Sequence, residues 1–124
     1  MRVVVAGLGA VGTRAARQLA STDEVEQVIV TDLDEDRVSE VVSSLGAKSK
    51  GHPVAPEELP DADVVVLATP PGVQLGQARD LVGRGISVVS TSDAMADVRG
   101  LLDLDAEAEA RKVADNVTFE GYLA

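Results

Sequence analysis

The chain is organised around the stretch Ala6-Gly7-Leu8-Gly9-Ala10-Val11-Gly12. The β-branched run at residues 3–5 precedes it and predicts a buried strand, whereas residues 13–20 are typical of a helix. The glycines therefore fit the pattern G-x-G-x-x-G at a strand-to-helix turn, the context in which this pattern binds the pyrophosphate of a dinucleotide. The first glycine permits the tight turn, the second leaves room for the phosphates, and the third lets the helix pack closely on the strand.

An acidic residue one strand further along supports this interpretation. Residues 28–30 predict the second strand, and Asp32 follows them about 20 residues after Gly12. A carboxylate at this separation accepts hydrogen bonds from the adenosine ribose of a bound dinucleotide. The alternative is that Asp32 caps the next helix and that the glycines only form a tight turn. The agreement of motif, context and acid spacing favours the dinucleotide site.

The remaining apolar runs predict alternating strands and helices. We expect strands at residues 2–6, 26–31, 63–68 and 86–90, an edge strand within 47–54, a sixth strand at 117–123, helices at 10–21, 34–45 and 73–82, and helical segments at 56–59 and 105–112. Asp34 or a neighbour is the expected cap of the second helix, and Gly46 is its expected end. With right-handed crossovers this order gives an α/β, Rossmann-type, doubly wound parallel sheet of about six strands with helices on both faces.

The composition limits both the architecture and the chemistry. The 124 residues, 45% of them hydrophobic, suffice for a single dinucleotide-binding domain over residues 1–124 with an aliphatic core. The lack of cysteine excludes disulfides and thiolate chemistry, and His52, the only histidine, is expected on a loop surface rather than in a metal site. The net charge of −10 would repel nucleic acid and anionic membranes. No signal peptide or membrane span is predicted, so we expect a cytoplasmic protein.

Ligands of such a sheet bind beyond the carboxyl ends of the strands, where the strand order reverses. We expect loop 7–12 to hold the pyrophosphate, loop 32–34 the adenosine ribose and loop 68–72 the middle of the cofactor, with residues 90–92 nearest the nicotinamide. Pro70 and Pro71 would also suit a rigid exit from a strand. The predicted cofactor-binding residues are Gly7, Leu8, Gly9, Ala10, Val11, Gly12, Asp32, Leu33, Arg37, Ala68, Thr69, Pro70, Pro71 and Thr91.

Charge near the ribose bears on the choice of cofactor. The carboxylate of Asp32 would pair with free ribose hydroxyls and repel a 2′-phosphate, so the sequence favours NAD over NADP. Arg37 could reach a 2′-phosphate, but we expect it to stack near the adenine or to pair with Asp34 or Glu40. No acid–base residue stands out near the expected crevice, so the catalytic residues and the substrate stay open.

Several stretches carry a resemblance to known families: Gly7–Gly12, Asp32–Arg37, Asp63–Ala68 and Gly85–Ser92. Over roughly residues 1–105 the chain resembles the amino-terminal Rossmann domain of saccharopine dehydrogenase-like proteins. Ala68–Val73 is also similar to the glucose–fructose oxidoreductase/inositol dehydrogenase group. The Glu-Lys-Pro signature of that second group is missing, and Thr91-Ser92-Asp93 stands in its place.

Members of both families carry a second domain that binds the substrate and supplies most catalytic groups. The resemblance therefore implies that this chain is the cofactor-binding half of an NAD(P)-dependent oxidoreductase, without a substrate domain, and that alone it is not efficiently catalytic. Two alternatives stay open, namely a regulatory domain that senses a nucleotide without chemistry and a fold that serves assembly with an empty site. A homo-oligomer stays open as well.

Overall fold

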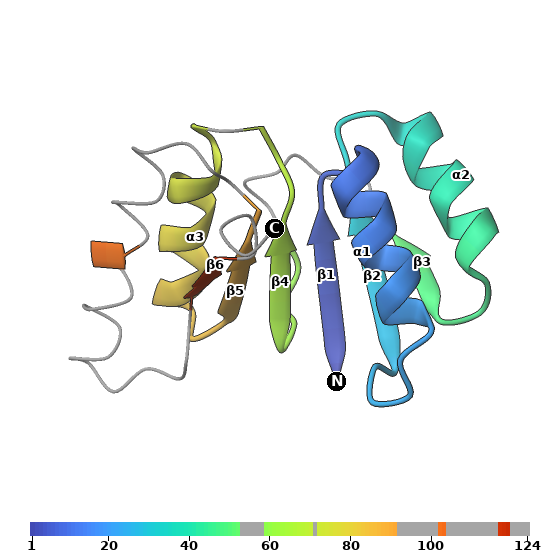
Figure 1. Ribbon diagram of the computed structural model, residues 1–124, viewed down its shortest axis with the longest axis horizontal. Coiled ribbons are helices and arrows are strands. Elements are labelled where there is room, and N and C mark those ends of the chain that lie inside the picture. Colours follow the sequence, from blue (N-terminus) through green and yellow to red (C-terminus); the bar gives the residue numbers. More distant parts are fainter. Residues whose placement is uncertain (53–58, 71, 92–101, 104–116, 120–124) are drawn as a thin grey trace.

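A computed structural model describes residues 1–52, 59–70, 72–91, 102–103 and 117–119. In these residues six parallel strands form one sheet in the order β3-β2-β1-β4-β5-β6 (Figure 1). The strands are β1 (Arg2–Ala6), β2 (Gln27–Thr31), β3 (Ser49–Gly51), β4 (Val64–Leu67), β5 (Ser87–Ser90) and β6 (Val117–Phe119), and the helices are α1 (Ala10–Ala20), α2 (Glu35–Leu45) and α3 (Gln74–Gly83). The predicted α/β fold is confirmed. The predicted helical segment at 105–112, and all but the last residue of that at 56–59, lie outside the described residues.

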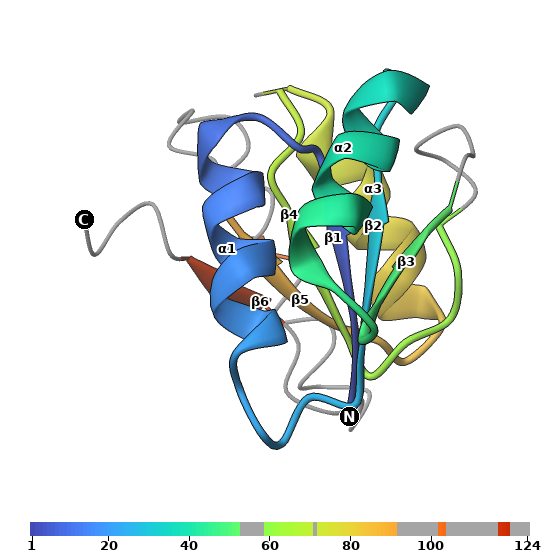
Figure 2. The ribbon, with the colours of Figure 1, turned by 90° about the vertical axis from the view of Figure 1, so that its right-hand side faces the viewer.

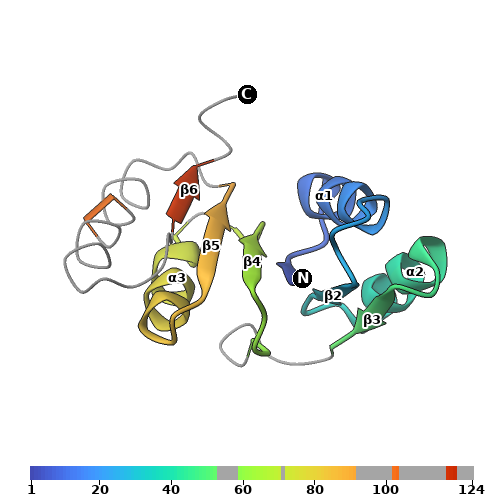
Figure 3. The same ribbon diagram turned by 90° about the horizontal axis from the view of Figure 1, so that it is seen from below.

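Helices cover both faces of the sheet. Helices α1 and α2 lie on one face and α3 lies on the other, as the view from below shows most clearly (Figure 3). Figure 2 shows α1 and α2 next to each other in front of the strands. The strand order runs outward from β1 in both directions, so the reversal of strand order falls between β1 and β4.

Alternate residues of β1 contribute to two separate cores. Val3 and Val5 pack in the cluster beneath α1 and α2, whereas Val4 and Ala6 pack in the cluster beneath α3. None of the four is more than 2% exposed. Because a parallel strand covered by helices is buried on both faces, it needs a continuous apolar run rather than alternation, and this is what residues 3–6 supply.

The second helix begins and ends at the residues that the sequence predicted. The Asp34 carboxylate accepts hydrogen bonds from the backbone N–H groups of Asp36, at 3.1 Å, and Arg37, at 3.2 Å. Gly46 follows the last turn with φ of 87°, a left-handed backbone conformation that residues other than glycine rarely adopt. These local signals position the loop between β2 and α2, which borders the site described below.

The edge strand β3 corrects one expectation. We predicted His52 on a loop surface, but its backbone N–H donates to the Val30 carbonyl at 2.9 Å and its side chain is half-buried. The backbone pairing with β2 therefore continues one residue past β3. Its Nδ1 atom is buried, with no hydrogen-bond partner in the part of the chain that the structure describes.

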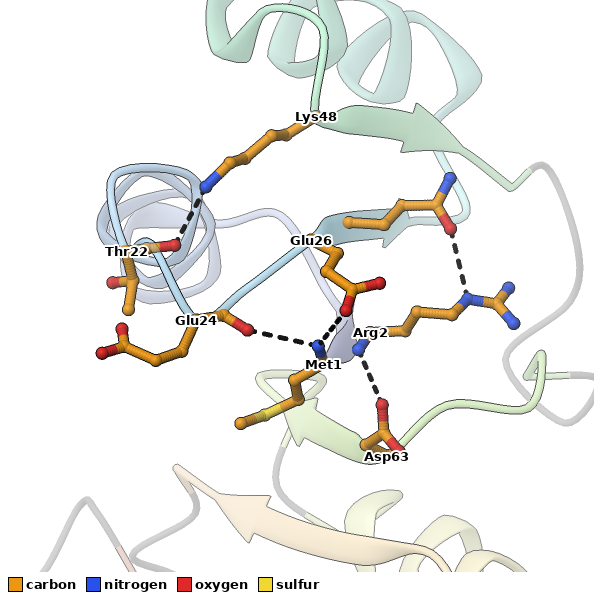
Figure 4. Close-up of polar contacts among 8 residues, drawn as sticks. Met1, Arg2, Thr22, Glu24, Glu26, Lys48 and Asp63 are labelled. Carbon is orange, nitrogen blue, oxygen red and sulfur yellow. Dashed lines mark hydrogen bonds and ion pairs between the residues drawn. The ribbon is translucent and has the colours of Figure 1, made fainter.

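Polar contacts join the amino-terminal ends of the strands, opposite the site (Figure 4). The amino group of Met1 lies 3.3 Å from the Glu26 carboxylate, and the backbone N–H of Arg2 donates to Asp63 at 2.7 Å. Lys48 donates to the Thr22 carbonyl at 2.9 Å. The Met1–Glu26 ion pair is exposed, and a pair of this kind contributes only about 0–1 kcal/mol. Burial of the apolar cores is the larger source of stability.

Two kinds of site are absent from the described residues. Among them there is no helix with both the length and the apolar character that crossing a bilayer requires. Nor do three or more His, Cys, Asp or Glu side chains of these residues gather as ligands for a metal ion.

Candidate functional site

The glycine turn between β1 and α1 is packed so tightly that two of its glycines are obligatory. Gly7 has φ of 96°, and a Cβ added to it would lie 2.5 Å from the Ala68 carbonyl oxygen. A Cβ added to Gly12 would lie 1.7 Å from the Gly7 carbonyl oxygen. Gly9 differs, because a Cβ there would meet nothing within 4 Å. The protein itself does not need a glycine at position 9, so that glycine keeps space open on the outside of the turn.

Within the described part of the chain, the first turn of α1 has no side-chain cap. Gly9 is the N-cap, with no side-chain hydrogen bond to the first N–H groups and no acidic residue in the first turn. The contrast with α2 is clear, since Asp34 caps that helix and Glu35 and Asp36 occupy its first turn. A helix N-terminus carries unpaired N–H groups and a partial positive charge. The α1 terminus is therefore suited to an anion from outside the protein.

A pocket of about 490 Å³ lies at the carboxyl ends of β1, β2 and β4. It is lined by Ala6, Gly7, Leu8, Gly9, Thr31, Asp32, Leu33, Ala68, Thr69, Pro70 and Val73. Leu33 is 77% exposed at its margin, and Val73 is 46% exposed. Apolar side chains exposed around a concave surface are typical of ligand sites, in which a few polar groups fix the orientation of the ligand.

Asp32 is the carboxylate of this pocket. Its Oδ2 accepts a hydrogen bond from the backbone N–H of Leu8 at 2.7 Å, and its Oδ1 accepts one from the backbone N–H of Asp34 at 2.9 Å. The alternative that Asp32 caps α2 is wrong, because the cap is Asp34. A carboxylate offers about four lone-pair positions, so Asp32 retains capacity for further donors.

Arg37 occupies a position that the sequence did not predict. Its Nε donates to the Leu8 carbonyl at 2.8 Å, rather than pairing with Asp34 or Glu40. Arg37 also lines a second groove, of about 380 Å³, between α1 and α2, together with Ala10, Thr13, Arg14, Arg17, Glu40, Val41 and Ser44.

The other predicted site residues fall in several places. Gly7, Leu8, Gly9, Asp32, Leu33, Ala68, Thr69 and Pro70 line the pocket together. Ala10 lines the second groove, Val11 is 53% exposed, and Gly12 is buried under the turn. Thr91 lies outside the pocket lining, because its N–H and its hydroxyl both donate to the Leu67 carbonyl, at 3.1 and 3.0 Å. Pro71 lies outside the described residues.

Sequence reasoning missed a buried polar group behind the pocket. Gln74 and Ser90 are 1% and 0% exposed, and Ser90 Oγ donates to Gln74 Oε1 at 2.5 Å. Gln77, 8% exposed, accepts from the Thr69 hydroxyl at 2.7 Å. A signal was present, because Gln74 lies four residues before Ala78 and seven before Leu81, the spacing of one apolar helix face.

Comparisons with known sequences identify the family. The sequence-family model described as "Semialdehyde dehydrogenase, NAD binding domain" matches residues 2–108 of this chain. N-acetyl-gamma-glutamyl-phosphate reductase of Herminiimonas arsenicoxydans is 36% identical over 100 residues, which cover 77% of this chain. The match covers only 28% of the length of that relative.

Solved structures share the fold. Saccharopine dehydrogenase from Saccharomyces cerevisiae has a TM-score of 0.70 at 20% identity, over 86% of this chain and 25% of that one. The apo scyllo-inositol dehydrogenase from Lactobacillus casei has a TM-score of 0.77 at 17% identity, over 97% of this chain and 36% of that one. GenD2 from gentamicin A biosynthesis, solved in complex with NAD, has a TM-score of 0.74 at 24% identity, over 95% of this chain and 34% of that one.

These comparisons confirm the resemblance to the Rossmann domains of saccharopine and inositol dehydrogenases and add the family that the sequence alone had not named. The chain belongs to the semialdehyde dehydrogenase family, whose NAD binding domain it matches.

Proposed function

We propose that this chain binds NAD at the carboxyl edge of its sheet and serves as the cofactor-binding domain of a longer oxidoreductase. The observation that carries the proposal is the α1 N-terminus, which has no cap of its own beside a pocket of about 490 Å³. An uncapped helix N-terminus next to a glycine turn accommodates a pyrophosphate, because the backbone N–H groups and the helix dipole both favour negative charge. The NAD in the GenD2 structure supports the same ligand class.

In this proposal each part of the pocket has a role. The open side of Gly9 lets the pyrophosphate approach the backbone, and Asp32 accepts hydrogen bonds from the adenosine ribose. Leu33 offers an exposed apolar side chain on which the adenine can rest. Thr69 and Pro70 border the middle of the cofactor. When bound, the nicotinamide supplies the hydride transfer of an oxidoreductase.

We further propose that NAD is preferred over NADP. Asp32 lines the pocket and would repel a 2′-phosphate, whereas it complements a free diol. Arg37 is the opposing influence, because it lines the adjoining groove with Arg14 and Arg17, and such guanidinium groups attract phosphate. The Nε of Arg37 is already used by the Leu8 carbonyl, which favours a structural role.

The catalytic groups and the substrate-binding groups would come from another part of the longer protein. The relative from Herminiimonas arsenicoxydans is named as a reductase of N-acetyl-gamma-glutamyl phosphate, which is an acyl phosphate. By analogy, the longer protein would act on a substrate at the oxidation level of an aldehyde or an activated acid. Residues 1–124 would then form one dinucleotide-binding domain.

Calorimetric titration of the purified chain with NAD⁺, NADH and NADP⁺ tests the proposal. We expect saturable one-to-one binding of NAD(H) with a Kd below about 1 mM, a value typical of cofactor and substrate affinities, and weaker binding of NADP⁺. Lack of binding of all three at millimolar concentration would overturn the proposal. Binding coupled to a change of oligomeric state would instead favour the regulatory alternative.

A further inference from the structure

Gln74 is an unusual residue for the place that it occupies. It is the first residue of α3, where a helix usually meets solvent, yet only 1% of it is exposed. Burying an amide without partners costs free energy, so a buried glutamine needs hydrogen bonds to compensate. The polar contacts of Gln74 are therefore the reason that a glutamine can stand there.

Those contacts join two different strand ends. Gln74 Nε2 donates to the carbonyl of Thr69, two residues past the end of β4, at 2.7 Å. Its Oε1 accepts from the hydroxyl of Ser90, the last residue of β5, at 2.5 Å. The same Nε2 lies 3.5 Å from Thr91 Oγ1. One side chain thus ties the loop that leaves β4 to the end of β5.

The loop that Gln74 holds is a wall of the pocket. Thr69 and Pro70 line it, and Val73, the residue before Gln74, lines it too. The preceding Ala68 is in tight contact with the glycine turn, because a Cβ on Gly7 would lie 2.5 Å from the Ala68 carbonyl oxygen. A shift of this loop would therefore change the width of the pocket beside the turn.

The wall lies on the far side of the glycine turn from Asp32. Strand β1 stands between β2, which ends near Asp32, and β4, which ends near Thr69. A dinucleotide lies across the point where the strand order reverses, with its adenosine ribose at the carboxylate after the second strand. The other half of the dinucleotide must then extend over the ends of β4 and β5.

From this arrangement we infer that Gln74 is a positioning residue that sets the affinity of the pocket for the half of the dinucleotide beyond the pyrophosphate. The inference rests on the proposed function and assigns that half of the site to a residue that does not line the pocket. Gln74 acts through Thr69 and Pro70, whose place it holds relative to β5. The adenosine half, held by Asp32 and the α1 N-terminus, does not depend on it.

The test compares two ligands that share the adenosine half. ADP carries the adenosine ribose and the two phosphates, and NAD⁺ adds the nicotinamide riboside. The variant Gln74→Met keeps the length of the side chain and removes its hydrogen bonds at both Nε2 and Oε1, whereas Ser90→Ala removes the donor to Oε1 and keeps the Gln74 amide. The matched control is Gln18→Met, because Gln18 is exposed on α1. Calorimetry gives the two dissociation constants, and thermal unfolding verifies that each variant is folded.

We expect Gln74→Met to raise the Kd for NAD⁺ about three- to tenfold, the range that the loss of one or two buried hydrogen bonds produces. Ser90→Ala should raise it about two- to threefold. The Kd for ADP should stay within about twofold in both variants, and Gln18→Met should change neither constant. The ratio of the two dissociation constants is the decisive quantity, because a general loss of stability would weaken both ligands alike.

In folded variants, an unchanged ratio of the Kd for NAD⁺ to the Kd for ADP overturns the inference, whether neither ligand binds more weakly or both weaken equally. If Gln74→Met does not fold, Ser90→Ala decides by the same ratio. Failure of the wild-type chain to bind either ligand overturns the proposed function and the inference with it. Wild-type binding with an unaffected ratio overturns the inference alone.

Discussion

The backbone N–H of Leu8 donates to Oδ2 of Asp32 at 2.7 Å. The residue proposed to bind the ribose therefore also holds the glycine turn in place, although the two are 24 positions apart in the chain. The carbonyl of the same residue, Leu8, accepts a hydrogen bond from Arg37 Nε at 2.8 Å. The turn is thus fixed from both sides before any cofactor arrives, which lowers the cost of ordering it upon binding.

The double role of Asp32 leads to the first prediction. In Asp32→Asn the amide oxygen can still accept from Leu8 N–H, but the charge that repels a 2′-phosphate is gone. We expect the Kd for NAD⁺ to rise about tenfold, since hydrogen bonds to a charged group contribute about 1.5–3 kcal/mol. The ratio of the Kd for NADP⁺ to the Kd for NAD⁺ should fall by at least the same factor. Calorimetric titration with both cofactors measures the two constants. An unchanged ratio of NADP⁺ to NAD⁺ affinity would show that Asp32 does not face the ribose.

The second prediction separates two glycines of one motif. Gly9→Leu should abolish NAD⁺ binding while the chain stays folded, because a Cβ there meets no protein atom within 4 Å and the side chain would fill the space proposed for the phosphates. Because leucine is a poorer N-cap than glycine, the free energy of unfolding should fall by only about 1 kcal/mol. Circular dichroism during heating and calorimetry measure the two effects. If Gly9→Leu binds NAD⁺ with the affinity of the wild type, the cofactor does not bind against this turn.

Gly12→Ala should behave in the opposite way and lose the fold. Its Cβ would lie 1.7 Å from the Gly7 carbonyl oxygen, so the backbone of α1 or of the turn must move. We expect a loss of at least about 3 kcal/mol in the free energy of unfolding, at the upper end of overpacking effects. Denaturant unfolding measures it. A stable Gly12→Ala chain would mean that helix and strand are less closely packed than the structure has them.

The third prediction concerns the N-cap at the start of α2. Asp34→Ala removes the acceptor for the N–H groups of Asp36 and Arg37, and should cost about 1 kcal/mol of stability, a typical value for an N-cap. Asp34→Ser should recover most of the loss, because serine is an equally good cap. Urea unfolding of the three chains gives the comparison. Equal stability of Asp34→Ala and the wild type would contradict the role of this cap.

The fourth prediction tests the arginine beside the turn. Arg37→Met removes the bond to the Leu8 carbonyl and a positive charge beside the glycine turn. We expect residual NADP⁺ binding to weaken at least about fivefold, since a guanidinium–phosphate pair contributes more than a neutral hydrogen bond. Binding of NAD⁺ should weaken less than about threefold. The matched control is Arg14→Met in the same groove. If the binding of NADP⁺ and of NAD⁺ weakens equally, Arg37 only stabilises the glycine turn and does not contact the 2′-phosphate.

Some parts of the site could be predicted because their causes are local. The spacing of Gly7, Gly9 and Gly12, the cap at Asp34 and the glycine at 46 each depend on residues within a few positions of one another. The strand at residues 2–6 followed from an apolar run that only a sheet covered on both faces accommodates. These features were found where they were expected.

The positions of Arg37, Thr91 and His52 could not be predicted in this way. Each is decided by an acceptor carbonyl that is distant in the chain, in Leu8, Leu67 and Val30 respectively. A sequence pattern gives the strand in which such a carbonyl lies, but not which side chain reaches it. The buried pair of Gln74 and Ser90 is of the same kind, because 16 positions separate the two residues.

The sequence by itself therefore determined the sheet, its helices and the glycine turn with its acidic partner, because periodicity and turn chemistry act over short stretches of chain. Only the tertiary structure decided what holds the pocket in shape. Its walls depend on hydrogen bonds between the ends of different strands, and those partners become neighbours only after the sheet has formed.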